Sequence, residues 1–398
     1  MERLNRAWAV PSGLISFFTA VNHRTVGLRY ITTAFLFFLL AGIQALVMRL
    51  QLAQPGLDVL SPEAYNQFMT MHGSTMMFLF AIPVMEGLGI YLVPLMIGTR
   101  DMAFPRLNAF GYWVYLISGL TLYASFFAGN APDGGWFNYV PLTGKGFSPG
   151  VGIDFWVTTI TFVEVAALVA AVELIVTILK LRAPGMSANR MPIFVWSVLV
   201  MAFMIVFAMP PLMVASVLLG LDRLVGTHFF NAAAGGQPIL WQHLFWVFGH
   251  PDVYIIALPG FGIISMVIPT FVRRPIAGYT LVVMATVAIG FLSFGLWVHH
   301  MFASGLPLMG LSFFAAASMM IAIPSGIQVF SWIATIWRGR AMLDTAFLFA
   351  LGFLVIFVAG GLTGVMVASV PFDWQVHDTY FIVAHFHYVL IGAAVLPV

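Results

Sequence analysis

The chain contains no cysteine, and only 8% of its 398 residues are charged. Without thiols, disulfides, thiolate metal sites and cysteine nucleophiles are all excluded. An average soluble domain has about 25% charged residues, so this chain has too few polar side chains to cover a soluble surface. The scarcity of charge therefore excludes a soluble enzyme, a disordered chain and a nucleic-acid-binding protein.

Hydrophobic residues make up 61% of the chain, and they form repeated apolar runs of about 20 residues, the length of a transmembrane helix. Because helices satisfy the backbone inside a membrane, we predict an all-α, polytopic transmembrane helix bundle that forms one domain, residues 1–398. The first 27 residues lack a signal-peptide pattern. The ten predicted spans cover roughly residues 28–52, 70–98, 106–128, 150–180, 190–220, 240–270, 276–304, 308–337, 343–370 and 378–398.

The basic residues predict how the bundle is oriented. With ten spans and the N-terminus inside, thirteen of the 16 Lys and Arg residues fall on the inner side and three on the outer side. A missed or invented span would destroy this asymmetry. The inner residues are Arg3, Arg6, Arg24, Arg29, Arg100, Arg106, Lys180, Arg182, Arg190, Arg273, Arg274, Arg338 and Arg340, and the outer ones are Arg49, Lys145 and Arg223.

Six of the ten histidines fall at one depth, in the outer half of the membrane, when each is counted from its helix end at about 1.5 Å per residue. A single histidine inside a membrane has two equally good explanations. It binds a metal, or it contacts the backbone or lines a cavity. Six at one level, from four spans, predict a metal or cofactor layer, since imidazole is the commonest side-chain metal ligand. They are His72, His250, His299, His300, His385 and His387.

The local spacing of these histidines predicts how they are shared. His385 and His387 are two residues apart, so a helix turns them about 200° from one another and they serve two different cofactors. His299 and His300 are neighbours and are able to converge on one ion with a third histidine such as His250. With no thiolates and few carboxylates at this level, imidazole ligation suits Cu, Fe or Zn rather than Mg or Ca.

Tyr254 follows His250 by four residues, so its phenol lies on the same helix face, one turn deeper. A phenol beside a metal is able to donate a proton and an electron. The simpler explanation is a tyrosine at the membrane–water interface, but Tyr254 is predicted to lie too deep in the membrane for that.

Short motifs accompany the histidines. They occupy residues 241–246, 249–251, 297–302, 377–380 and 384–388, with further motifs at 92–98, 101–106 and 329–335. Together they resemble the signatures of subunit I of the haem–copper oxidases, closest to the cytochrome c oxidase-like A-type branch, over nearly the whole chain. The resemblance implies a terminal respiratory oxidase that reduces O2 to water.

The resemblance also implies the cofactors, namely two haems that are haem A-like, one copper and a non-redox Mg on the outer side. His72 and His387 would bind a low-spin haem, His385 a high-spin haem, and His250, His299 and His300 the copper, with Tyr254 beside it. Arg49, Asp373 and Trp136 would surround the haems, and His377 and Asp378 would lie near the haem propionates and the Mg site.

Departures from the family pattern concern proton handling. Asp252 stands where the family usually has Glu, so its carboxyl has less reach. Gln328, in place of a lysine, is unable to titrate, which puts in doubt a second path through Ser325, Gln328 and Ser265 to Tyr254. A first path starts at Asp101 and is weakened by Ile90, which replaces an asparagine.

Additional carboxyl groups offset these losses. They are Glu86, Glu164 and Glu173. Glu164 and Glu173 are nine residues apart, about 2.5 helical turns, so they point in opposite directions and do not pair within the helix. A replacement proton route and plain helix-packing contacts both remain open as explanations.

The implied assembly needs partners. Without cysteine the chain offers no dinuclear copper site, so a subunit II-like partner would bring electrons from cytochrome c or a similar donor, next to a subunit III-like chain and membrane lipids and with no nucleic acid. We expect a bacterial inner (plasma) membrane location. The family has about two more helices after Val398, so we expect a C-terminal truncation or a second chain. A nitric oxide reductase, and less readily a non-catalytic haem-binding subunit, stay as alternatives.

Overall fold

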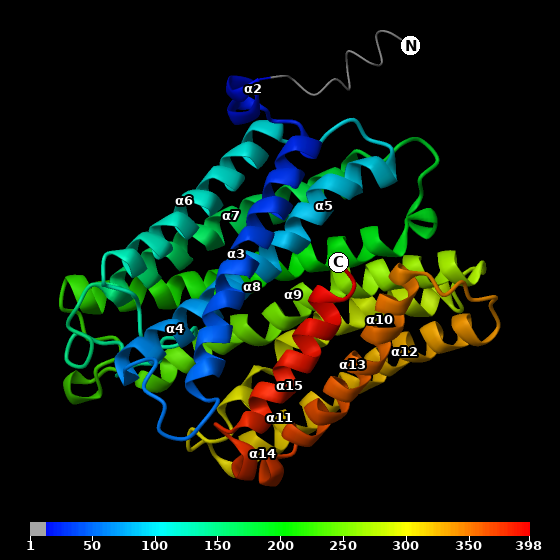
Figure 1. The fold of residues 1–398 in the computed structure, drawn as a ribbon. Coiled ribbons are helices and arrows are strands. Elements are labelled where there is room, and N and C mark those ends of the chain that lie inside the picture. The colour runs from blue at the N-terminus through cyan, green and yellow to red at the C-terminus, as the bar shows by residue number, and fades with distance from the viewer. Residues whose placement is uncertain (1–12) are drawn as a thin grey trace.

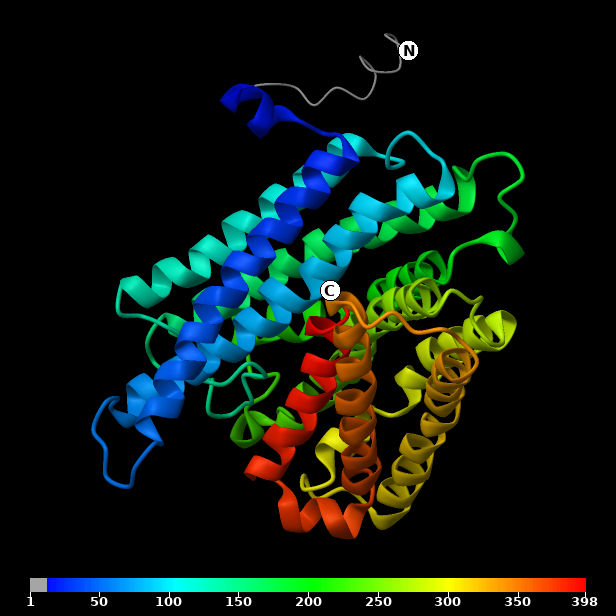
Figure 2. The same ribbon diagram turned by 45° about the vertical axis from the view of Figure 1, so that its right-hand side comes forward.

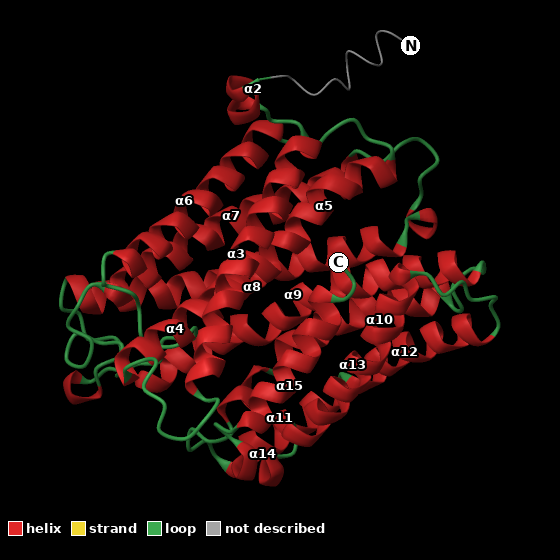
Figure 3. Cartoon of the chain, in the orientation of Figure 1, coloured by secondary structure: helices red, strands yellow, loops and turns green. Residues whose placement is uncertain are grey.

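The computed structural model describes residues 13–398, so Arg3 and Arg6, two of the basic residues used to orient the chain, lie outside the described residues. Over the described range the chain is helical and contains no strand (Figure 3). Eight helical segments are long and apolar enough to cross a membrane. The predicted all-α transmembrane bundle is therefore confirmed.

The eight segments follow the chain order of the predicted spans. They are α3 (His23–Gln51), the run Pro62–Ile97 made of α4 (Pro62–Ser74), η1 (Thr75–Ala81) and α5 (Ile82–Ile97), α6 (Pro105–Phe127), α7 (Gly152–Lys180), α8 (Ile193–Leu224), α9 (Pro238–Val272), the run Leu308–Trp337 made of α11 (Leu308–Met320) and α12 (Ala322–Trp337), and α13 (Thr345–Val367). Short elements lie between them, namely α2 (Leu14–Thr19), η2 (Ala188–Arg190) and η3 (Ala232–Ala234).

One predicted span is not a continuous helix, and another follows a sharp bend. The run 276–304 contains α10 (Tyr279–Leu292) and then the 3₁₀ turns η4 (Ser293–Gly295) and η5 (Trp297–Met301), which corrects the expectation of one α-helix there. The last predicted run, 378–398, is formed by α15 (Tyr380–Leu390) and η6 (Ile391–Val395), and this segment meets α14 (Val370–Val376) at a bend of 109°. If the bent pair counts as one span, the described residues hold up to nine spans. Counting the shorter apolar helix Tyr279–Gly295 as well gives ten, the predicted number.

The helices form two groups joined by α8 and α9 (Figure 1). Within the first group α3 packs against α5, α6 against α7 and α7 against α8, while α9 packs along α8. In the second group α10 packs against α12 and α13 against α15. Figure 2 shows the second group, coloured yellow to red, gathered on the side away from α3 and α6. Because α9 contacts both groups, a side chain on α9 is able to meet side chains from either one.

Helices at the centre of the bundle are more buried than those at its outside. The most apolar window of Pro62–Ile97 is 78% buried and that of α9 is 67% buried, whereas the windows of α3, of Leu308–Trp337 and of α13 are 22–28% buried. The outer helices expose large apolar side chains such as Phe127 and Met309. Such surfaces suit lipid chains rather than water.

Small residues let α3 and α5 approach closely. A Cβ atom at Gly87 would lie 2.7 Å from the Cβ of Tyr30, and one at Gly27 would lie 2.8 Å from the Cβ of Tyr91. Glycine at helix interfaces allows close packing of membrane helices, where dispersion contacts replace the hydrophobic effect. This contact fixes α5, and with it the buried side chains that α5 carries towards α7.

Candidate metal and cofactor site

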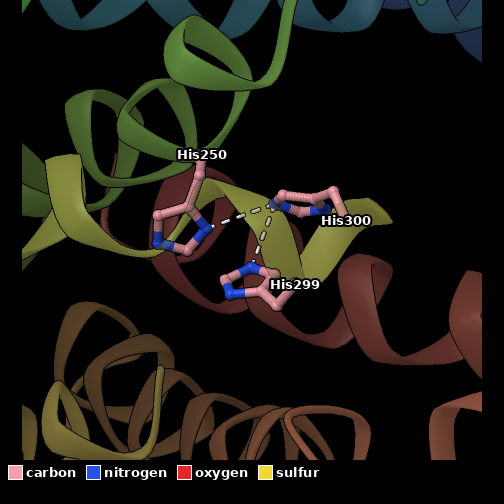
Figure 4. Close-up of side chains that lie close together, drawn as sticks. All are labelled: His250, His299 and His300. Atoms are coloured by element: carbon pink, nitrogen blue, oxygen red, sulfur yellow. Dashed lines mark hydrogen bonds between the residues drawn. The ribbon is translucent and has the colours of Figure 1, made fainter. Parts of the chain in front are cut away.

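Three imidazoles meet where α9 passes the turn η5 (Figure 4). His250 Nδ1 lies 3.2 Å from His300 Nε2, and His299 Nε2 lies 3.1 Å from the same atom. One ring nitrogen from each histidine falls within 4.8 Å of the others. A metal about 2.0 Å from each of three nitrogens in tetrahedral geometry holds them about 3.3 Å apart. The three side chains therefore fit one metal ion.

Neighbouring side chains fix the orientation of these rings. His299 Nδ1 shares a hydrogen bond of 2.8 Å with the hydroxyl of Ser318 on α11. The indole of Trp246 stacks on His300, and its N–H donates to the hydroxyl of Tyr139. Metal-binding histidines usually have such support on the side away from the metal. The histidines were expected from the sequence, but Ser318 and Tyr139 were missed because they come from distant segments with no pattern of their own.

The 3₁₀ conformation of η5 changes the local geometry that the sequence predicted. Adjacent residues of an α-helix point about 100° apart, whereas those of a 3₁₀ helix point about 120° apart. His299 and His300 still converge because their Nε2 atoms, at the far ends of the rings, turn towards each other.

Tyr254 and Asp252 follow His250 along α9. The rings of Tyr254 and His250 have centroids 4.9 Å apart, at an interplanar angle of 61°, so the expected proximity of one helical turn is present. Asp252 is fully buried, and neither carboxyl oxygen has a hydrogen-bond partner within residues 13–398. Tyr254 thus lies beside His250, and Asp252 is a buried carboxyl without a partner on the same helix.

The other three histidines expected to bind cofactors all engage Nδ1 with a backbone carbonyl. His72 Nδ1 lies 2.9 Å from the oxygen of Ala41, His385 Nδ1 3.1 Å from that of Gly360, and His387 Nδ1 2.7 Å from that of Val383. This arrangement selects the tautomer with Nδ1–H and leaves Nε2 as the atom able to bind iron.

These three histidines lie in two different surroundings. His72 on α4 and His387 on α15 lie close enough to interact electrostatically, although 315 positions separate them in the chain numbering. His385 interacts electrostatically with His250 and His300. His72 and His387 thus form one pair, and His385 belongs with the three-histidine group.

A polar group lies at the outer end of α14. His377 Nδ1 is 3.7 Å from the Asp373 carboxylate and His377 Nε2 is 3.7 Å from that of Asp378. Asp373 is buried and Asp378 is exposed. An open cavity of about 530 Å³ lies beside them, with His377 in its wall. His377 and Asp378 are the side chains for which the sequence predicts an outer cation site, and the cation itself stays a prediction.

The side chains expected around the haems lie in two places. Arg49, at the end of α3, stands over the ring of Tyr380 on α15, with 5.7 Å from its guanidinium carbon to the ring centroid. Trp136 packs its indole against Phe245 and Trp246, with ring centroids 5.2 Å and 5.8 Å apart. Trp136 thus lies on the same aromatic cluster that supports His300.

Burial also acts on Tyr139, which lies in the loop between α6 and α7. Desolvation raises the pKa of Tyr139 to about 12, although the hydrogen bond from Trp246 acts in the opposite direction. The phenol therefore stays neutral and accepts the indole N–H at ordinary pH.

The expected second proton path is not connected by hydrogen bonds between its own members. Ser265 accepts the indole N–H of Trp332 at 2.8 Å, Gln328 donates its amide to the hydroxyl of Thr286 at 3.0 Å, and Ser325 donates to a carbonyl of its own helix. The amide oxygen of Gln328 has no hydrogen-bond partner within residues 13–398. The path through Ser325, Gln328 and Ser265 to Tyr254 stays a prediction.

Asp101 follows the end of α5, at the end of the bundle that carries Arg100. Its carboxylate accepts the backbone N–H groups of His23 and Met102, both at 2.9 Å. Glu173 on α7 lies close enough to Asp101 for an electrostatic interaction. Two carboxyl groups thus lie near one another where the sequence predicts the start of proton uptake.

Comparison with known families covers almost the whole chain. Residues 25–398 match the family described as cytochrome c and quinol oxidase polypeptide I. Cytochrome c oxidase subunit 1 of Bacillus subtilis is 49% identical over 96% of the chain, and the protein of the same name from Synechocystis is 48% identical over 95%. A putative cytochrome c oxidase subunit 1-beta of Streptomyces coelicolor is 49% identical over 99%.

The chain is shorter than these relatives. It spans 61% of the length of the Bacillus protein and 68% of the Synechocystis and Streptomyces proteins. Among solved structures, a haem–copper terminal oxidase dimer determined by cryo-electron microscopy has a similar fold, with a TM-score of 0.76 and 18% identity over 94% of this chain and 66% of that one. The likeness to that structure concerns the fold alone.

Proposed function

The chain belongs to the family of cytochrome c and quinol oxidase polypeptide I, and from this premise we propose that it is the catalytic subunit of a terminal respiratory oxidase that reduces O2 to water. The observation that carries the proposal is the convergence of His250, His299 and His300, with His385 close by. This donor set suits a copper ion facing a haem iron.

The remaining ligands follow from the same reasoning. His72 and His387 would hold the iron of a low-spin haem, and His385 that of a high-spin haem, each through Nε2. Bound haem and copper would supply the one-electron chemistry that oxygen reduction needs. A haem A type, a magnesium ion at His377 and Asp378, and haem contacts from Arg49, Asp373 and Trp136 belong to the proposal as well.

The chain itself supplies protons and excludes water. Tyr254 would hold a proton at its phenol oxygen one helical turn from His250, and Asp252 would hold another at a fully buried carboxyl. Asp101 would collect protons at the basic end of the bundle, which charge asymmetry places inside. Electrons and protons that arrive from opposite sides conserve energy, because each charge moved across 100 mV stores about 2.3 kcal/mol.

The protein is an integral membrane protein, which we place in a bacterial plasma membrane. Its oxidase activity requires a donor-binding subunit II-like partner, since no cysteine is present for a thiolate copper site. A subunit III-like chain, cytochrome c or a similar donor, and lipid on the exposed apolar helix faces complete the proposed assembly, and residues 1–398 would act in it as one domain.

The test is turnover of the purified complex with O2 and, separately, with nitric oxide, together with copper content and a reduced-minus-oxidised optical spectrum. We expect O2 turnover, one copper per complex and a high-spin haem that binds carbon monoxide. The buried carboxyl groups Glu86 and Glu164 make nitric oxide reduction the second candidate, and preferential turnover of nitric oxide would favour it. A complex without a high-spin haem would contradict both and indicate a non-catalytic subunit.

A further inference from the structure

Two buried glutamates from different helices line one small cavity. Glu86 on α5 and Glu164 on α7 are each 1% exposed. The cavity between them has about 10 Å³ of space for water centres, which is room for about one water molecule. The rest of its lining is apolar apart from Tyr115.

Three of the four carboxyl oxygens are without a hydrogen-bond partner in the described chain. Oε1 of Glu86 and both side-chain oxygens of Glu164 make no hydrogen bond within the described chain. The Tyr115 hydroxyl in the cavity wall donates to the carbonyl of Leu79 at 2.6 Å and is already satisfied. A buried water needs two to four polar partners, and the three unpartnered carboxyl oxygens of Glu86 and Glu164 are enough to supply them.

Charge also links the two side chains. Burying an unpaired carboxylate is costly, and two carboxylates at one cavity repel each other. Neither an arginine nor a lysine lines the cavity, so protons are the only positive charges available to neutralise the pair. Two further titratable side chains pack against Tyr115, namely Tyr30 and Tyr112, with ring centroids 5.3 Å and 6.4 Å from it.

The cavity lies between the proposed region of proton uptake and the metal site. Phe78 lines it and stacks on Phe248, two residues before His250. In the other direction Glu173, which lies near Asp101, follows Glu164 by nine residues on α7, about 13 Å along the helix. A group in this position is well placed to receive protons from one side and to release them to the other.

We propose that Glu86 and Glu164 bind one water molecule between them and act as a single proton-holding pair inside the membrane. The proposal rests on the oxidase function proposed above and adds a site to it. When a proton leaves the pair, the remaining negative charge is shared by both carboxyls through the bridging water, and a proton from the inner side replaces the one lost. Two glutamates that only fill space between helices would hold their protons permanently.

The experiment is the reduced-minus-oxidised infrared difference spectrum of the purified complex in H2O and D2O. We expect a carboxyl carbonyl band in the wild type that is sensitive to deuterium. E86Q and E164Q should each remove or shift this same band, because the two groups share one water. E173Q is the matched control, since Glu173 is also buried on α7 but does not line the cavity, and it should leave the band in place.

The opposite results are equally clear. If E86Q and E164Q leave every carboxyl band unchanged, or alter two independent bands, the two glutamates are not a proton-holding pair. If E164Q does not assemble, E86Q and E86D still decide the question, since E86D keeps the proton and should shift the band rather than remove it. The spectrum is recorded by reducing the haems without turnover, so a wild type without O2 turnover would contradict the proposed function and not the pair.

Discussion

The indole ring of Trp246 lies parallel to the imidazole of His300, with ring centroids 4.1 Å apart and an interplanar angle of 12°. Trp246 also donates its N–H to Tyr139, so one side chain connects a loop phenol to a candidate copper ligand. Stacking on one face and a hydrogen bond at the far edge together hold the His300 ring in one orientation.

Replacing Trp246 should therefore loosen the metal site. We expect W246A to weaken copper binding by roughly 10- to 100-fold, the usual cost of losing a group that orients a metal ligand. W246F keeps an aromatic ring on His300 but loses the hydrogen bond to Tyr139, and it should retain most of the copper. Copper per haem after dialysis against a chelator measures both. Equal copper retention in W246A and wild type would contradict the supporting role of Trp246.

Removing a ligand should have a larger effect. We expect H250A to lose copper and O2 turnover while the low-spin haem spectrum survives, because His72 and His387 lie outside the three-histidine group. The matched control is H243A on the same helix, since His243 accepts the indole N–H of Trp297 at 3.2 Å and is not part of that group. H243A should keep its copper. Wild-type turnover in H250A would refute the copper assignment.

The sequence predicted the helices and the converging histidines because both depend on local regularities. Apolar runs of membrane length predict spans, and the spacing of four residues predicts the contact between His250 and Tyr254. The break after Leu292 was not predictable in this way, since residues 293–301 are mostly apolar and hydropathy does not distinguish α-helix from 3₁₀ turns.

The proximity of Glu86 and Glu164 could not be predicted from the sequence either. The spacing of residues within one helix correctly indicated that Glu164 and Glu173 do not pair. The partner of Glu164 at the cavity comes from α5, 78 positions earlier in the chain. Only the packing of α5 against α7, which no periodicity encodes, brings the two together.

Asp101 offers a test of proton uptake that leaves the local structure intact. In D101N the amide oxygen still accepts the backbone N–H groups of His23 and Met102, but the side chain no longer carries a proton. We expect O2 turnover to fall about tenfold, equivalent to about 1.4 kcal/mol of activation free energy, with haem and copper content unchanged. D133N, at an exposed position in the loop after α6, is the control. An unaffected rate in D101N would remove Asp101 from the path.

Tyr139 predicts a dependence of stability on alkaline pH. Its pKa is about 12 in the folded protein and about 10 in an unfolded chain, so the unfolded state loses its proton first as the pH rises. The stability that the neutral phenol contributes is complete below pH 10 and is lost between about pH 10 and 12. Thermal unfolding of Y139F should therefore vary less over this range than that of the wild type. Identical pH profiles would contradict the burial of Tyr139.

Arg223 holds the loop that leads from Tyr139 into α7. Its side chain is completely buried and makes two hydrogen bonds to the Asp154 carboxylate, at 2.5 Å and 3.1 Å. It also donates to the backbone carbonyls of Thr143, Ser148 and Gly150. Lys145 is a second partner of Asp154, but it is 38% exposed.

The two cations should differ sharply when removed. R223M leaves Asp154 without its buried partner and three carbonyls unsatisfied, so we expect a loss of about 3–5 kcal/mol and rapid proteolysis of the loop 143–150. K145M removes an exposed ion pair and should cost about 1 kcal/mol or less. Thermal unfolding and limited proteolysis of the purified complex measure both variants. Equal losses in the two would mean that the buried contacts of Arg223 contribute no more to stability than the exposed ion pair of Lys145.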